Sequence, residues 1–125
     1  MALLSVPRPY VPPGGLLAWQ AKRVRLYIET NLAQPLGIGV IAAVLNLSPS
    51  HFCRVFKQTF GVTVHRYVMQ RRIELAKHLM QTTPEKLSAI ATSCGMSDQS
   101  HFTRRFQNIV GETPAVWRRA SGERK

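Results

Sequence analysis

Acidic side chains and cysteine are both scarce in this sequence. Its 125 residues hold 6 Asp and Glu against 17 Lys and Arg, and the 2 cysteines, Cys53 and Cys94, lie far apart in the chain. The acidic residues are scattered, so they predict no carboxylate pair and no acidic metal site. Without a C-x-x-C pair or a His at zinc-ligand spacing, the sequence indicates neither a disulfide framework nor a zinc module. It suits a reducing cytoplasm.

Long hydrophobic runs are missing as well. The longest extends only from Val40 to Leu45, far short of the roughly 20 apolar residues that cross a bilayer. We therefore predict no membrane span and no membrane partner. The opening stretch MALLSVPRPY has no Lys or Arg before its short apolar run, so it does not predict a secretory signal. Its prolines and the following Gly14-Gly15 pair predict a loose lead-in over residues 1–15.

The formal net charge stands out. It is +11 at pH 7 with neutral His, and the sequence pI is about 10.9. A chain of this length holds one compact domain or two very small ones, which excludes a large multi-domain enzyme. An excess of positive charge attracts polyanions, and at this size nucleic acid is the favoured one. We predict that the chain is not an enzyme and uses no cofactor and no metal.

The sequence contains an internal repeat. Four short blocks occur in the first half: Ile41-Ala42, Asn46-Leu47-Ser48, His51-Phe52-x-Arg54-x-Phe56 and Gly61-x-Thr63. Four counterparts follow in the same order: Ile90-Ala91, Gly95-Met96-Ser97, His101-Phe102-x-Arg104-x-Phe106 and Gly111-x-Thr113. This order indicates one structural unit present twice, with one extra residue in the second turn.

Each unit predicts two helices around a tight turn. In the first unit, a helix over residues 38–45 places Ile38, Ile41 and Leu45 on one face. Asn46, and Gly95 in the second unit, tolerate the left-handed backbone conformation with which a helix ends sharply.

The second helix of each unit begins at a polar cap. Ser48-Pro49 is a cap and first-turn pair, and its helix ends near Phe60. In the second unit, Ser97 or Asp98 caps a helix that ends near Val110. The predicted inward residues are Phe52, Val55, Phe56, Thr59, Phe102, Phe106, Ile109 and Val110. The predicted outward residues are Ser50, Cys53, Arg54 and Lys57, and Ser100, Thr103, Arg104 and Gln107.

This layout is that of a helix-turn-helix, whose second helix enters the DNA major groove. Residues 63–81 lack Gly and Pro and predict a linker helix roughly 27 Å long at 1.5 Å per residue. One face of this helix carries Val64, Val68, Arg72, Ala76, Leu79 and Met80. Such a strut can hold the two second helices near the ~34 Å spacing of one DNA turn. Because Arg72 lies within an apolar face, a buried, hydrogen-bonded structural role is favoured over DNA contact.

The full prediction is an all-α fold with an opening helix over residues 16–31 and a short closing helix over 114–119. The first helix-turn-helix unit spans residues 16–62, the linker helix 63–81 and the second unit 82–120. Residues 121–125 are predicted to be a loose tail.

These residues resemble the C-terminal DNA-binding domain of the AraC/XylS family of bacterial transcription regulators. The resemblance covers about Gln20 to Ala120. Its most specific stretches are Leu47-Ser48-Pro49-Ser50-His51-Phe52-x-Arg54-x-Phe56-Lys57, Tyr67 with Arg72 and Ala76, Cys94-Gly95-Met96-Ser97-Asp98-Gln99-Ser100-His101-Phe102-x-Arg104-x-Phe106, Gly111-x-Thr113-Pro114 and Trp117-Arg118.

The resemblance implies seven helices, with two helix-turn-helix units joined by a rigid helix. It also implies that the second helix of each unit enters successive major grooves on one face of double-stranded DNA, and that activators of this type contact RNA polymerase. Three residues depart from the family pattern. Gly37 and Gly39 stand where a capping hydroxyl and a helix former are usual, and Arg105 stands where the first unit has Val55.

Six outward residues are candidate base readers: Ser50, Cys53, Arg54, Ser100, Thr103 and Arg104. Arg54 and Arg104 match the family's base- or phosphate-contacting position, and an Arg fork can bridge O6 and N7 of guanine. The four short side chains can contact a thymine methyl group or a phosphate, or simply face the groove. A solvated surface position is the alternative for both arginines.

Eight residues are candidate phosphate contacts: His51, Lys57, Arg66, Arg71, His101, Gln107, Arg118 and Arg119. For the basic members the alternative is a solvated surface. For His51 and His101 it is simple helix packing.

The favoured function is a sequence-specific double-stranded DNA-binding transcription regulator, bound as a monomer in the cytoplasm of a bacterium, at the nucleoid. A general RNA-associated basic protein shares the charge but does not require the duplicated motif. A third possibility is an interaction module without DNA binding. The sequence leaves these alternatives open.

Overall fold

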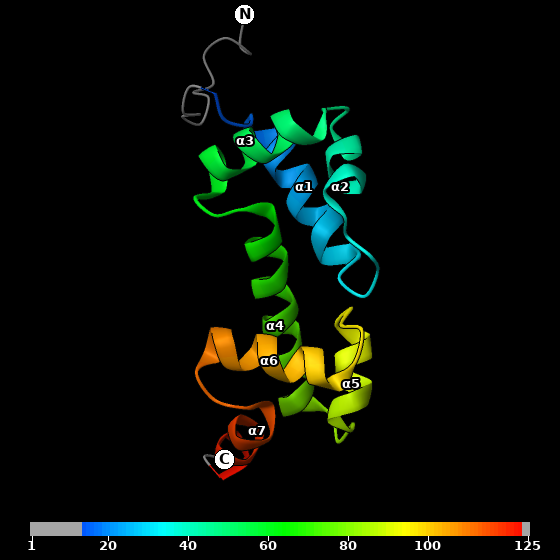
Figure 1. The fold of residues 1–125 in the computed structure, drawn as a ribbon, viewed down its shortest axis with the longest axis vertical. Coiled ribbons are helices and arrows are strands. Elements are labelled where there is room, and N and C mark those ends of the chain that lie inside the picture. Colours follow the sequence, from blue (N-terminus) through cyan, green and yellow to red (C-terminus); the bar gives the residue numbers. More distant parts are fainter. Residues whose placement is uncertain (1–13, 124–125) are drawn as a thin grey trace, which may run out of the picture. The chain divides into compact units, whose positions relative to one another are not determined.

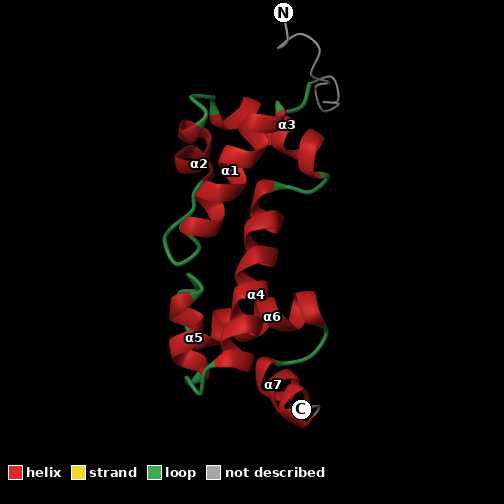
Figure 2. Cartoon of the chain, turned by 180° about the vertical axis from the view of Figure 1, so that it is seen from behind, coloured by secondary structure: helices red, strands yellow, loops and turns green. Residues whose placement is uncertain are grey.

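The computed structural model describes residues 14–123, which form seven α-helices and no strand (Figure 2). In chain order the helices are α1 (Ala18–Thr30), α2 (Ile38–Val44), α3 (Pro49–Phe60), α4 (Val64–Thr82), α5 (Leu87–Ser93), α6 (Gln99–Val110) and α7 (Pro114–Glu123) (Figure 1). The all-α prediction is confirmed. The opening stretch, for which no secretory signal was predicted, and most of the lead-in lie outside the described residues. The closing helix extends further than predicted, because α7 continues to Glu123 through residues expected to be a tail.

The described chain divides into two compact units. The first contains residues 14–27 and 37–64, and the second contains residues 28–36 and 65–123. Residues 63–81 were predicted to be a linker between the two helix-turn-helix units. In the structure, nearly all of this helix belongs to the second unit, together with a segment from the end of α1 and the loop after it.

The first unit is built around apolar side chains of α1, α2 and α3. Val24, Ile41, Phe52 and Phe56 are almost fully buried there, and the rings of Phe52 and Phe56 lie 5.6 Å apart. The chain before α1 closes over the end of α3, where the amide of Leu16 donates to Oγ1 of Thr59 at 2.7 Å. These contacts fix α3 on its inward face and leave its opposite face outside.

The turns within both helix pairs follow the predicted backbone geometry. Asn46 has φ of 60° and Gly95 has φ of 77°, and each follows the end of the first helix of its pair. In both turns the amide three residues beyond the helix end donates to an earlier carbonyl, from Leu47 to Ala42 at 3.1 Å and from Met96 to Ala91 at 3.0 Å. The two repeats therefore change direction by the same hydrogen-bonded turn.

The second helix of each pair is capped by a side chain. Ser48 Oγ accepts from the amide of His51 at 3.2 Å, with Pro49 in the first turn of α3. Asp98 Oδ1 accepts from the amide of His101 at 2.7 Å at the start of α6. The choice that the sequence left open between Ser97 and Asp98 is settled in favour of Asp98.

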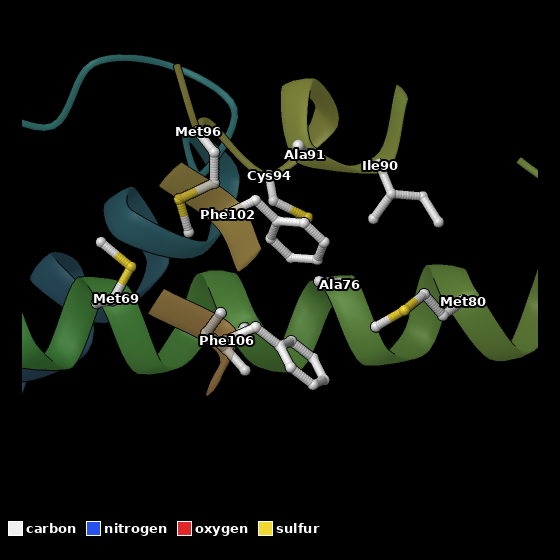
Figure 3. Close-up of a cluster of buried hydrophobic side chains, with 10 residues drawn as sticks. Met69, Ala76, Met80, Ile90, Ala91, Cys94, Met96, Phe102 and Phe106 are labelled. Atoms are coloured by element: carbon white, nitrogen blue, oxygen red, sulfur yellow. The ribbon is translucent and has the colours of Figure 1, made fainter. Parts of the chain in front are cut away.

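The core of the second unit contains side chains from α4, α5, α6 and the turn between α5 and α6 (Figure 3). Its buried members are Met69, Ile73, Ala76, Met80, Ile90, Ala91, Cys94, Met96, Phe102 and Phe106. Trp117 of α7 packs against this cluster, with its ring centroid 5.9 Å from that of Phe106. The core therefore contacts α6 through Phe102 and Phe106, which correspond in the repeat to the buried Phe52 and Phe56 of α3.

One predicted core residue is exposed. Ile109 is 41% exposed, so its predicted inward position is wrong. Its counterpart in the first unit, Thr59, is covered by the chain at Leu16. Ile109 lies in the last turn of α6 and lacks comparable cover among the described residues. Helical periodicity predicts the face of the helix on which a side chain lies, but not how far along that face another segment of the chain covers the helix.

Arg72 has the predicted structural role. Its Nε donates to the carbonyl of Leu32 at 3.1 Å and its Nη2 to the carbonyl of Gln34 at 2.8 Å. Partial burial lowers the pKa of this guanidinium from its ordinary value. The bonds tie the loop after α1 to α4 within the second unit.

The two cysteine thiols are expected to react at very different rates. Burial of Cys94 in the core raises the pKa of its thiol to about 11, with a smaller opposing effect from Arg72. Because the thiolate is the reactive form, we expect this thiol to react only after unfolding exposes it and restores its ordinary pKa. Cys53 is only partly buried on α3. A chromogenic disulfide reagent at neutral pH should therefore modify one thiol in the folded protein and the second only in denaturant.

Cys53→Ser is the matched control for this assignment, and it should abolish the fast reaction while leaving the slow one. Equal rates for both thiols in the folded protein would show that Cys94 is not held in the core.

Candidate nucleic-acid interface

The outer face of α3 presents polar and basic side chains that are free of protein partners among the described residues. Ser50, Arg54 and Lys57 are exposed, and Cys53 is partly buried between them. A shallow depression at the start of the helix is lined by Ser48, Ser50, His51 and Arg54. The buried phenylalanines on the opposite face fix the direction of these side chains.

The outer face of α6 repeats this arrangement. Ser100, Arg104 and Gln107 are exposed, and Thr103 is partly buried. No protein group among residues 14–123 bonds the side chain of Arg104. The six predicted base readers therefore lie on two equivalent helix faces, three on each.

The histidines of the repeat differ in their surroundings. His51 is exposed in the depression on α3. His101 is partly buried, with Nδ1 3.2 Å from Oγ of Ser97, and Nε of Arg105 donates to its Nε2 at 3.4 Å. Arg105 is thus held beside His101 and is only partly buried, where Val55 in the first unit is buried. The ring of His101 is therefore held by Ser97, just before α6, and by Arg105 within it.

The other predicted phosphate contacts fall into two groups. Arg66 on α4 and Arg119 on α7 are exposed. Arg71 forms an ion pair with Glu29, and this hydrogen bond raises the pKa of its guanidinium. The positive charge of Arg71 is therefore partly neutralised by Glu29 within the protein.

Arg118, also a predicted phosphate contact, is hydrogen-bonded within the protein. Its Nε donates to the carbonyl of Met80 at 3.2 Å, its Nη1 to that of Glu85 at 2.6 Å and its Nη2 to that of Thr83 at 2.6 Å. All three guanidinium nitrogens hold the end of α4 and the loop before α5. Arg118 is thus a structural arginine, which clamps α7 to that loop. A basic residue in a surface helix gives no sequence signal of such distant carbonyl partners.

The structure adds one residue to the outer face of α6 that the sequence analysis treated only as a cap. Asp98 is exposed and stands at the first turn of α6, beside Ser100. Between residues 48 and 61 and between residues 98 and 111 it is the only acidic residue. A comparison of the two repeats indicates this difference in the sequence, because the residue that corresponds to the acidic Asp98 is the neutral Ser48.

The described residues offer neither a metal site nor a single helix that could span a membrane. Within residues 14–123 no three His, Cys, Asp or Glu side chains lie together as a metal site. No single helix in this part of the chain is long and apolar enough to cross a membrane, and only the pair α2 and α3 reaches that length and composition, with a bend of 78°.

The chain is similar to proteins of known kind. A family model described as a helix-turn-helix domain matches residues 41–120. The probable transcriptional regulator LumQ of Photobacterium leiognathi is 36% identical over 88 residues, which is 70% of this chain and 36% of LumQ. The transposon Tn10 TetD protein of Escherichia coli is 36% identical over 98 residues, or 78% of this chain and 71% of TetD. This chain therefore spans about a third of LumQ but most of TetD.

A solved structure supports the same relationship. The crystal structure of a transcriptional regulator from Chromobacterium violaceum, described as an AraC-type DNA-binding domain-containing protein, is 27% identical. It covers 82% of this chain and 91% of its own, with a TM-score of 0.76.

Proposed function

Because the chain belongs to the AraC/XylS-type family of helix-turn-helix transcription regulators, we propose that it binds double-stranded DNA sequence-specifically and regulates transcription. The reading helices, α3 and α6, enter successive major grooves in this proposal, and one chain binds an asymmetric site as a monomer. Such a regulator binds the chromosome in the bacterial cytoplasm, at the nucleoid. RNA polymerase is its proposed protein partner, and catalysis has no part in the proposal.

One observation carries this proposal. Arg54 and Arg104 occupy the same position in two copies of a capped, core-anchored helix, and each is exposed without a protein partner among residues 14–123. An unpaired guanidinium keeps its full set of planar donors, which matches O6 and N7 of guanine in the major groove. A fold that served only packing would not require the same free fork twice.

The remaining basic side chains supply a different part of the binding free energy. Lys57 is exposed on α3, and Arg66 and Arg119 are exposed outside the reading helices. Contacts of such residues with phosphates position a protein on DNA and add affinity that depends on salt rather than on sequence. The proposal therefore assigns base preference to Arg54 and Arg104, and general affinity to Lys57, Arg66 and Arg119.

Arg54→Ala and Arg104→Ala are each expected to weaken binding to a selected operator by about 1–3 kcal/mol and to relax base preference at a few positions. Lys57→Ala should instead weaken binding to operator and random duplex by nearly the same factor. Operators are first selected from a random duplex pool, and dissociation constants are then measured for each variant at two salt concentrations.

This series also separates the proposal from its rivals. A general RNA-associated protein would bind single-stranded RNA as tightly as the selected duplex, and an interaction module would show no salt-dependent DNA affinity. If both arginine variants weakened operator and random duplex equally, the two arginines would be phosphate contacts.

A further inference from the structure

The caps of the two reading helices differ in charge, because Ser48 is neutral and Asp98 is acidic. Ser48 and Asp98 are both exposed, and both accept from the amide three residues further on, at 3.2 Å and 2.7 Å. Serine and aspartate are about equally good N-cap residues. Capping alone therefore gives no reason for a carboxylate in one copy of the repeat and a hydroxyl in the other.

Within the described part of the chain, Asp98 is an unpaired acidic residue on a helix face whose other exposed residues are neutral or basic. Among the other outward pairs, Ser50 and Ser100 are identical, as are Arg54 and Arg104, and the basic Lys57 corresponds to the neutral Gln107. Only at the cap does the second helix gain a negative charge. The two ion pairs among the described residues join Arg71 to Glu29 and Lys77 to Glu74, so neither involves Asp98. The carboxylate keeps its charge uncompensated on a face that otherwise suits a polyanion.

A carboxylate in this position distinguishes the chemical groups of DNA. The N-terminal residues of a helix-turn-helix reading helix approach the base edges, with phosphates on either side. A carboxylate repels phosphates and accepts only from amino groups, and cytosine N4 is its usual major-groove partner. Oδ1 of Asp98 already accepts the amide of His101, which leaves Oδ2 for such a donor.

We propose that Asp98 is a specificity-determining residue of the second reading helix. Its carboxylate weakens binding to DNA in general, and weakens it least where a base offers an amino group, cytosine N4 above all. Asp98 thereby raises the ratio of operator affinity to random-duplex affinity at the cost of total affinity. This inference rests on the proposed function as a DNA-binding regulator.

The test uses two variants that keep the cap and remove the charge, Asp98→Asn and Asp98→Ser. Dissociation constants are measured for random duplex and for the operator selected by the parent protein. Each variant should bind random duplex about three- to tenfold more tightly at low salt, because one repulsive charge near phosphates is gone. The ratio of operator to random affinity should fall by about the same factor.

Two controls separate position from charge. Glu85→Gln makes the same change in net charge in the loop before α5, outside both reading helices, and should leave the ratio unchanged. Ser48→Asp places the carboxylate at the equivalent cap of α3 and should weaken binding to random duplex by a similar factor. Circular dichroism checks that each variant keeps its helices.

The outcomes are distinct. A ratio that falls in both Asp98 variants and not in Glu85→Gln supports the inference. An unchanged ratio in folded Asp98 variants overturns it and leaves Asp98 as a cap alone. If the parent protein binds no DNA at all, the proposed function fails, and the inference that rests on it fails too.

Discussion

Gly95→Ala is expected to lower the free energy of unfolding by about 3 kcal/mol. Gly95 has φ of 77°, a conformation that costs an L-residue about 1 kcal/mol or more. A Cβ at this position would overlap the carbonyl oxygen of Leu32 and lie 3.0 Å from Cζ and Nε of Arg72. Relief of that overlap must move the loop off Arg72, which adds the cost of overpacking and of weakened hydrogen bonds. Urea denaturation followed by circular dichroism measures the loss.

Gly61→Ala is the matched control for this variant. Gly61 has nearly the same φ, 79°, but a Cβ there meets nothing within 4 Å. Its substitution should cost only the backbone term, about 1 kcal/mol. If the two alanine variants lost the same stability, the contact between the turn and Leu32 would contribute nothing, and backbone strain would account for both effects.

Phe106→Ala should destabilise the protein by about 3–5 kcal/mol. Its ring is fully buried and lies 5.8 Å from the ring of Phe102 and 5.9 Å from that of Trp117. Removing it leaves a cavity where α6 and α7 meet, so α6 should also lose its fixed orientation. Thermal and urea denaturation measure the stability. Operator binding by the remaining folded protein should be weakened in addition.

Ile109→Ala tests the same helix at an exposed position. Because 41% of Ile109 is already in contact with solvent, we expect it to cost less than about 1 kcal/mol. If Ile109→Ala lowered the free energy of unfolding as much as Phe106→Ala, the side chain of Ile109 would have to be covered by another group, and its position on α6 would not be exposed.

Local features of the fold were predictable from the sequence because neighbouring residues determine them. Asn46 and Gly95 predict turns with a left-handed backbone conformation, and Ser48-Pro49 predicts the start of a helix. The inward phenylalanines follow from helical spacing within one segment. The repeat strengthened each of these predictions, since the same signal occurred twice in the same order.

Features that depend on distant residues were missed. Arg118 bonds carbonyls more than thirty positions earlier in the chain, and nothing near Arg118 in the sequence distinguishes it from the exposed Arg119. The burial of Ile109 was predicted wrongly for the same reason, because cover comes from another segment. For the candidate site, periodicity gave the direction of the side chains, whereas their base or phosphate contacts stay predictions.

The grouping of residues 28–36 with the second unit has a consequence for dissecting the protein. A fragment beginning at residue 63 contains both helices of the second pair, yet it lacks Leu32 and Gln34. The guanidinium of Arg72 would then lose both carbonyl acceptors, and the turn at Gly95 would lose the backbone that lies against it. The repeat in the sequence therefore does not coincide with the compact unit, and a truncation at the repeat boundary removes backbone that Arg72 and Gly95 contact.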